Sequence, residues 1–169
     1  LPYQKARLLT FFEPTQASQA AVYNLRQSLI AIGAGGISGT ELGAGTQSQL
    51  RFLPERKTDF IFASYAEQFG FLGSLLLISL YLGLGLVSLF SAQANPQFEE
   101  RIWLAYAGSL FLTQVFLALA VNLGLLPVTG LPLPLLAAGG SSLLVLAFSL
   151  GLAQSCLKNS PRIRTLHLE

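Results

Sequence analysis

The chain has 169 residues, enough for one ordinary domain, but its composition is not that of a soluble one. Hydrophobic residues make up 52% of the sequence and charged residues only 11%, whereas a soluble domain carries roughly a quarter of charged residues. A net charge of +2, without a basic patch interleaved with aromatic residues, excludes a typical nucleic-acid-binding protein. The single Cys156 permits no disulfide and no cysteine-based metal site within one chain.

The placement of the charges indicates the class. Of the 18 charged side chains (10 basic and 8 acidic), 11 lie between Lys5 and Glu67. None occurs in residues 68–96 or 102–157. These uncharged apolar stretches are longer than the helices that ordinarily form the cores of soluble proteins. The sequence therefore predicts an all-α, polytopic helical membrane protein.

Three transmembrane helices are predicted within residues 68–157. They run at about 69–90, 102–122 and 135–156, each close to the roughly 20 residues that cross a bilayer. The apolar run 60–66 could extend the first helix outward. Between the second and third spans, residues 124–134 contain three prolines and cannot continue a helix. Irregular backbone at membrane level must be buried in protein or line a cavity.

The tail, residues 158–169, has three basic residues and one acidic residue, which favours a cytoplasmic location. Counting back through three spans places residues 94–101 inside and the loop region 1–67 outside the cytoplasmic membrane. Six basic residues in the outer segment argue the other way, so only the tail supports this orientation. Because the sequence begins at Leu1 and contains no Met, we expect the C-terminal part of a longer protein.

The outer segment has internal structure. A helix is predicted from about Gln19 to Ile32, with Ser18 as a candidate cap. The glycine-dense stretch 33–45 then requires turns or close backbone approaches. The apolar stripe of the predicted helix consists of Ala21, Leu25, Leu29 and Ile32.

Asp59 is the strongest candidate for chemistry. A carboxylate at the membrane boundary, flanked by Arg56 and Lys57, could act as a general base beside an anion site. The simpler interpretation is that Thr58 or Asp59 is the N-cap of a helix that begins at Phe60.

The neighbouring charges also have two interpretations each. Arg56 and Lys57 are either solvated interfacial cations or contacts for lipid phosphates, with Glu55 as a salt partner. Glu67, about two helical turns beyond Asp59, either faces the protein interior with a functional role or lies in the head-group zone. No metal-ligand spacing, nucleophile triad or nucleotide loop is present.

Four stretches together resemble the SEDS family (shape, elongation, division and sporulation proteins), in the right order and at the right separations. The amino-acid sequence of the second of the four stretches given below is more similar to the RodA branch of the family than to the FtsW branch. The stretches are Gln27-Ser28 through Ala31-Ile32-Gly33, Gly45-Thr46-Gln47-Ser48-Gln49-Leu50 through Leu53-Pro54-Glu55, Thr58-Asp59-Phe60-Ile61-Phe62, and Leu126-Pro127-Val128-Thr129-Gly130 with Pro132-Leu133-Pro134 and Gly139-Gly140-Ser141-Ser142.

The resemblance implies a peptidoglycan glycosyltransferase of the cytoplasmic membrane that polymerises lipid II for cell elongation or division, with a class B penicillin-binding protein as its partner. The family's essential acidic residue falls on Asp59, which then serves as the general base. Arg56 and Lys57 could stabilise the departing pyrophosphate, with or without a divalent cation such as Mg²⁺ or Mn²⁺. The candidate substrate-binding residues are Glu55, Arg56, Lys57, Glu67 and Gln47.

The sequence departs from the family pattern at positions that could line the substrate cavity. Lys57 stands where His is usual, and Thr40 stands within a replaced Gly-Lys-Gly. Ala118 occupies the position of a frequent Asn, and Ala137 and Ala138 replace Ser-Tyr. These losses leave two alternatives to the enzyme, a non-catalytic scaffold for a cell-wall synthase and a flippase for lipid II. The intact Asp59, and the absence of charged residues inside the spans, favour the enzyme.

Overall fold

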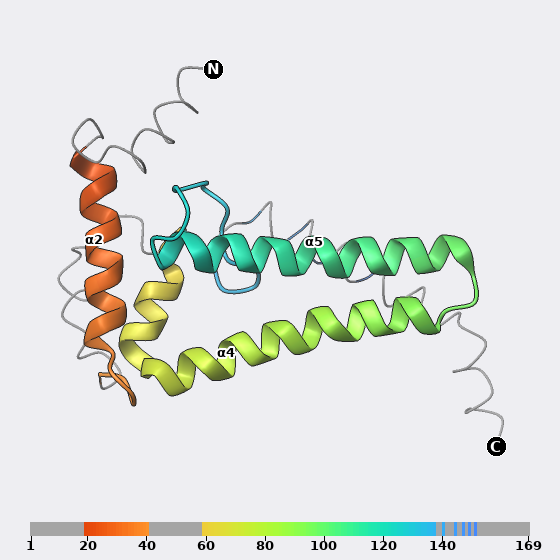
Figure 1. Cartoon of the computed structure of the whole chain (residues 1–169), viewed down its shortest axis with the longest axis horizontal. Coiled ribbons are helices and arrows are strands. Elements are labelled where there is room, and N and C mark those ends of the chain that lie inside the picture. Colours follow the sequence, from red (N-terminus) through yellow and green to blue (C-terminus); the bar gives the residue numbers. More distant parts are fainter. Residues whose placement is uncertain are drawn as a thin grey trace.

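The computed structural model describes residues 19–40 and 59–137, together with the single positions 140, 144, 147, 149 and 151. The helices with described bounds are α2 (Gln19–Ala34), α4 (Ile61–Ala94) and α5 (Phe98–Asn122), and no strand occurs among the described residues. Helices α4 and α5 lie antiparallel and side by side, and α2 lies across the end where α4 begins and α5 ends (Figure 1). The prediction of an all-α fold is confirmed.

Both helices of the antiparallel pair are long and apolar enough to cross a membrane. Helix α4 has 34 residues and α5 has 25, so each exceeds the predicted span: α4 begins eight residues before residue 69, and α5 begins four residues before residue 102. The single positions described beyond residue 137 are helical. Residues 135–137, where the third span is predicted to begin, form a turn, and its predicted end at residue 156 lies outside the described residues.

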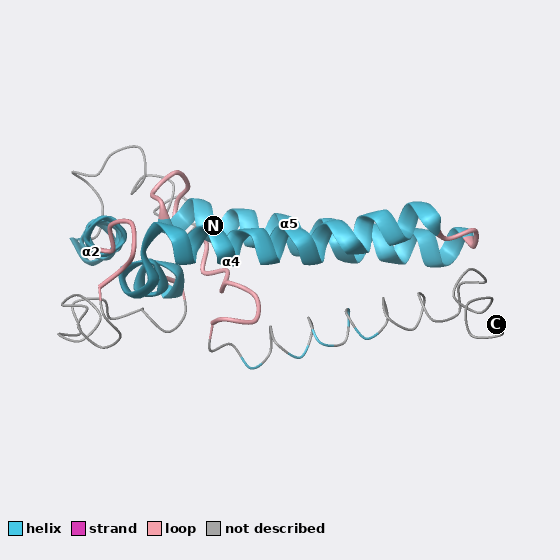
Figure 2. Cartoon of the chain, turned by 90° about the horizontal axis from the view of Figure 1, so that it is seen from below, coloured by secondary structure: helices cyan, strands magenta, loops and turns pink. Residues whose placement is uncertain are grey.

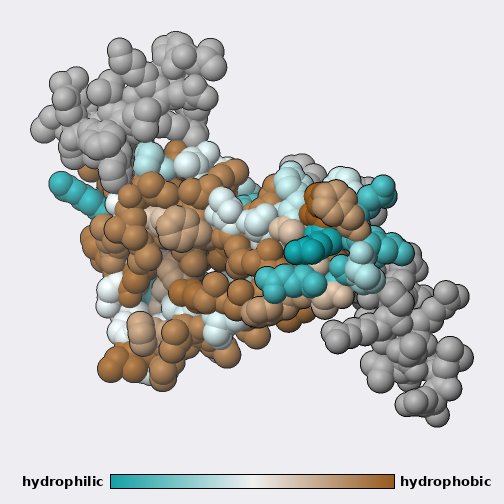
Figure 3. Space-filling view, turned by 45° about the vertical axis from the view of Figure 1, so that its right-hand side comes forward, coloured by the Kyte–Doolittle hydropathy of each residue, from teal (hydrophilic) through white to brown (hydrophobic). Residues whose placement is uncertain are grey.

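Much of the surface of this pair is hydrophobic, as expected for helices in contact with lipid or with further spans (Figure 3). Hydrophilic side chains gather where α4 turns into α5, in the segment 93–101. One turn into α5, Trp103 and Tyr106 are both 57% exposed and pack edge to face. Aromatic residues of this kind favour the membrane–water boundary, so the polar turn and its aromatic neighbours indicate where the bilayer ends.

Helices α4 and α5 approach closely because small residues lie at their contact. A Cβ atom at Gly85 would collide with the side chain of Leu112, and one at Gly108 would press on Ser88. The Ser88 hydroxyl donates a hydrogen bond to the carbonyl of Leu104 at 3.0 Å. Small residues that permit close backbone approach are typical of membrane helix pairs.

A sharp break divides α4 at Gly70, whose φ of 65° and ψ of −163° are not helical. In an unbroken helix the Phe71 N–H would bond to the carbonyl of Glu67; here it donates to Gly36 at 2.9 Å. The next N–H, of Leu72, donates to Ile37 at 3.1 Å. The turn after α2 therefore supplies acceptors to the second half of α4 and binds α2 to the break.

The segment after α5 folds back along the helix pair (Figures 1 and 2). The Gln114 amide donates to the carbonyl of Pro132 at 3.2 Å, and the Tyr81 hydroxyl donates to the carbonyl of Pro134. Leu133 is 1% exposed and packs in the core formed by both helices. Gln114 precedes the end of α5 by eight residues, about 12 Å of helix, so the part of this segment around Leu133 and Pro134 is buried against the helix pair, whereas residues 129–131 are exposed.

Candidate functional site

The candidate site lies where α2 crosses the start of α4 and the end of α5. Two fully buried residues of α2, Ser28 and Ala31, face this junction. The predicted stripe is only partly correct, because Leu29 is 46% exposed, whereas Ser28 and Ala31 of α2 and Gly35 just after the helix are buried. Small residues face α4 because the backbones nearly touch: a Cβ atom at Gly35 would collide with the carbonyl of Ala66.

Asp59 lies in the turn that leads into α4 and is partly buried. The following side chain, Phe60, is 1% exposed and packs with Ala31 and Ala63, with Ile32 and Val128 alongside. The Asp59 carbonyl accepts a hydrogen bond from the Asn122 side chain at 2.7 Å. Both the main chain of Asp59 and the residue after it are thus fixed to the three-helix junction.

The predicted N-cap at Thr58 or Asp59 is wrong in position. Helix α4 begins at Ile61, and Phe60 is its N-cap residue, with no side-chain capping hydrogen bond. The start is displaced because the Phe60 side chain packs against Ala31 of α2, and the Phe60 carbonyl accepts the Ser64 N–H at 3.4 Å. Asp59 lies one residue outside the capping position.

Glu67 is completely buried, which fits the interior alternative and not the head-group one. Its carbonyl accepts two hydrogen bonds from Thr40, one from the main-chain N–H and one from the hydroxyl, both at 2.9 Å. Thr40, a departure from the family pattern, therefore joins the turn after α2 to α4 just before the Gly70 break.

The remaining predicted site residues, Glu55, Arg56, Lys57 and Gln47, lie outside the described residues, and so does Ala138. Among the described residues, no group of three or more His, Cys, Asp or Glu side chains could hold a metal ion. The structure thus brings Asp59 and Glu67 to the start of one helix, eight residues apart in sequence, and leaves the cationic part of the predicted site undescribed.

Asn122 is a residue of this junction that the sequence pattern did not single out as a candidate. This residue is 0% exposed, and its side chain or main chain bonds to α2, α4 and α5. The sequence does contain a signal for Asn122. It is a polar residue at the end of an uncharged apolar span, where a buried amide needs hydrogen-bond partners. Ala118, at the position of the family's frequent Asn, lies one helical turn earlier and donates no side-chain bond. Its carbonyl accepts from Asn122 at 2.8 Å.

Comparisons with known proteins agree with this architecture. The model of the FtsW/RodA/SpoVE family of cell cycle proteins matches residues 1–161. The chain is 43% identical to the peptidoglycan glycosyltransferase MrdB of Escherichia coli K12 over 157 residues, 90% of this chain and 41% of that protein. It is also 43% identical to the probable peptidoglycan glycosyltransferase FtsW of Thiomicrospira cyclica over 155 residues, 89% of this chain and 39% of that protein.

A solved structure is similar as well. A chain from a study of how a peptidoglycan synthase complex coordinates polymerization and crosslinking matches with a TM-score of 0.76 and 32% identity. The match covers 95% of this chain and 43% of that one. The chain therefore spans about two fifths of the length of the relatives it matches. With a family match over most of its length, this multi-pass membrane chain belongs to the FtsW/RodA/SpoVE family of cell cycle proteins.

Proposed function

We propose that this chain is the catalytic part of a peptidoglycan glycosyltransferase that polymerises lipid II into glycan strands. The family membership supports this, and so do the two relatives named as peptidoglycan glycosyltransferases. The observation that carries the proposal is the position of Asp59. Its main chain is held at the junction of three helices, at one end of a pair long enough to span a bilayer.

In the proposed reaction, Asp59 takes a proton from the acceptor sugar hydroxyl as that oxygen attacks the anomeric carbon of the donor. The new glycosidic C–O bond forms while the bond to the undecaprenyl pyrophosphate breaks, and the pyrophosphate leaves with the electron pair. Arg56 and Lys57 stabilise the charge of the departing pyrophosphate, and Glu55 and Gln47 complete the substrate site. Mg²⁺ or Mn²⁺ is a further candidate component of the substrate site.

The proposed orientation places the α2 end of the molecule on the outer face of the cytoplasmic membrane, where lipid II is presented. The turn between α4 and α5 and the C-terminal tail then lie in the cytoplasm. A class B penicillin-binding protein is the proposed partner that cross-links the product. The similar chain in a peptidoglycan synthase complex supports a partner synthase of this kind.

The test is polymerisation of labelled lipid II by the full-length protein with its partner, for wild type and Asp59→Asn. We expect glycan strands from the wild type and a rate at least about 100-fold lower from the variant, the usual contribution of a general base. Chelation with EDTA in the same assay reads out any divalent cation requirement.

A wild-type rate from Asp59→Asn would overturn the role of Asp59. No polymer from either protein, with the complex intact and an active enzyme working alongside, would overturn the enzyme and leave the scaffold or the flippase. Transport of labelled lipid II into vesicles, independent of Asp59, would then identify the flippase.

A further inference from the structure

The amide of Asn122 uses all its donors inside the protein. Oδ1 accepts the Ala63 N–H at 3.2 Å, and Nδ2 donates to the carbonyls of Asp59 at 2.7 Å and Ala118 at 2.8 Å. Turning the amide over would place its oxygen against two carbonyls and its NH₂ against an N–H group. Only one orientation is therefore compatible with the site.

Asn122 itself is held from a third direction. The Ser28 hydroxyl of α2 donates to the main-chain carbonyl of Asn122 at 2.8 Å, and both residues are 0% exposed. The Ser28 bond thus holds the end of α5 against α2, while the side chain of Asn122, the last residue of α5, bonds to Ala63 of α4. Within the described residues, Asn122 joins all three helices through hydrogen bonds.

The amide contacts Asp59, in the turn before α4, and Ala63, in the first turn of α4, which are four residues apart. In a regular helix the Ala63 N–H would donate directly to the carbonyl of Asp59. Here the Asn122 side chain stands between them, accepting from Ala63 and donating to Asp59. The amide takes the place of the hydrogen bond that would extend α4 by one residue toward Asp59, and neither group is left unpaired.

We propose that Asn122 is a positioning residue for Asp59. By bridging Asp59 and Ala63, it sets the direction in which the chain enters α4, and hence the location of the Asp59 carboxylate. This inference rests on the proposed function, in which Asp59 is the general base. A structural cap would also make these bonds, but it would affect only the amount of folded protein. A positioning residue also changes the turnover of each folded molecule.

The experiment measures initial rates of lipid II polymerisation, over a range of lipid II concentrations, by the full-length protein with its partner. Rates are divided by the amount of folded complex, determined by size-exclusion chromatography and thermal unfolding. Asn122→Ala is compared with Gln114→Ala. Gln114 is the matched control, because it lies on the same helix and its amide also donates to a buried-segment carbonyl, that of Pro132. Gln114 lies eight residues before Asn122, about 12 Å along the helix.

We expect Asn122→Ala to lower kcat by roughly 10- to 100-fold, since a displacement of about 1 Å at a reacting group has effects of that size. KM for lipid II should change by less than about twofold, because the amide contacts only protein groups. Gln114→Ala should retain the wild-type kcat. If Asn122→Ala does not yield folded protein, Asn122→Ser, which keeps one donor, serves in its place with an intermediate loss of kcat expected.

Asp59→Asn is measured in the same series, so that the two proposals fail separately. A wild-type rate from Asp59→Asn would remove the proposed function and this inference with it. Loss of activity in Asp59→Asn, together with a wild-type kcat in the folded Asn122 variant, would overturn only the positioning role. Equal losses of kcat in the Asn122 and Gln114 variants would also overturn it, since they would indicate general packing.

Discussion

Single polar groups determine how the irregular segment after α5 is held at membrane level. The Tyr81 hydroxyl donates to Pro134, and the Tyr81 ring lies against Phe111 with centroids 5.9 Å apart. A proline-rich segment offers few N–H groups, so its carbonyls depend on side-chain donors from the helices. Tyr81 and Gln114, one from each helix of the pair, supply two of these donors.

We therefore expect Tyr81→Phe to loosen this segment while leaving the helix pair intact. The ring remains and fills the same space, but the Pro134 carbonyl loses its donor, at a cost of about 1 kcal/mol. Hydrogen exchange measured by mass spectrometry should rise in peptides covering residues 123–137. Tyr106→Phe is the control, since Tyr106 is 57% exposed on α5. Equal exchange in the two variants would contradict this role for the hydroxyl.

At this scale the sequence predicts the charged candidate residue better than the buried amide that contacts it. Asp59 stands out because it is a charge beside an apolar span, and local charge pattern is visible in one dimension. Asn122 lies 63 positions further along the chain and reaches Asp59 only through the packing of α4 on α5. Nothing in the local pattern around residue 122 indicates that contact.

Among the elements, α4 deviates most from its sequence pattern. Its apolar run gives no sign of a break, yet Gly70 adopts a conformation that essentially only glycine tolerates. The break exists because the turn after α2 competes for the N–H groups of Phe71 and Leu72. The helices and their approximate spans can be predicted from hydropathy. The break in α4 cannot, because it depends on a contact with the turn after α2, more than 30 residues earlier in the chain.

Gly70→Ala should destabilise this junction by at least about 2 kcal/mol. The backbone conformation is strained for alanine, and the new Cβ atom would collide with the main-chain nitrogen of Gly39. The expected measurement is a lower midpoint of thermal unfolding of the purified protein in detergent.

Gly83→Ala, on the same helix, is the matched control. A Cβ atom at Gly83 meets nothing within 4 Å, so this change should be neutral or slightly stabilising. Equal midpoints for Gly70→Ala and Gly83→Ala would show that the break in α4 is not required by the fold.

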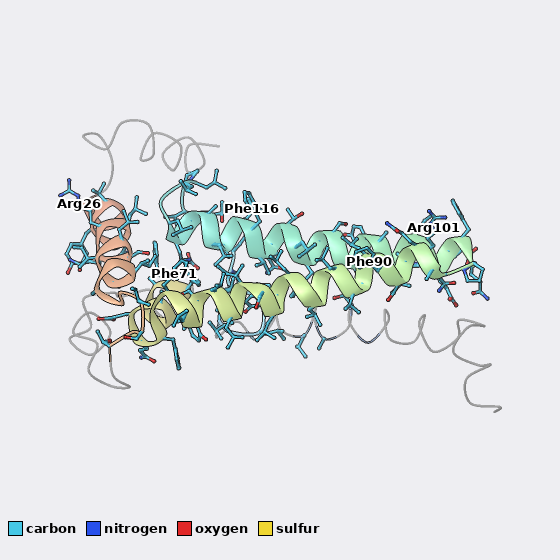
Figure 4. The ribbon with its side chains drawn as sticks, turned by 60° about the horizontal axis from the view of Figure 1, so that its bottom comes forward. Arg26, Phe71, Phe90, Arg101 and Phe116 are labelled. Atoms are coloured by element: carbon cyan, nitrogen blue, oxygen red, sulfur yellow. The ribbon has the colours of Figure 1, made fainter. Side chains whose placement is uncertain are left out.

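Across the whole molecule, polar groups lie at both ends of an apolar pair of helices. Arg26 on α2 and Arg101 in the first turns of α5 lie at opposite ends, with Phe71, Phe90 and Phe116 between them (Figure 4). Helix α5 alone, with 25 residues, spans about 37 Å, more than the roughly 30 Å of hydrocarbon in a bilayer. Composition predicts this arrangement, because lipid selects for apolar side chains. The direction of insertion depends on charges that are few and partly conflicting.

The proposed orientation predicts opposite labelling at the two ends. In a Cys156→Ala background, a cysteine is introduced either at Arg26, exposed on α2, or at Gln97, exposed between α4 and α5. A membrane-impermeant maleimide should label the Arg26→Cys protein in intact spheroplasts. It should label the Gln97→Cys protein only after permeabilisation, because that turn is proposed to be cytoplasmic. The reverse pattern would place Asp59 on the cytoplasmic side, away from lipid II on the outer face, and would contradict the proposed reaction. Labelling of both cysteines from one side would contradict the spanning of the bilayer by α4 and α5.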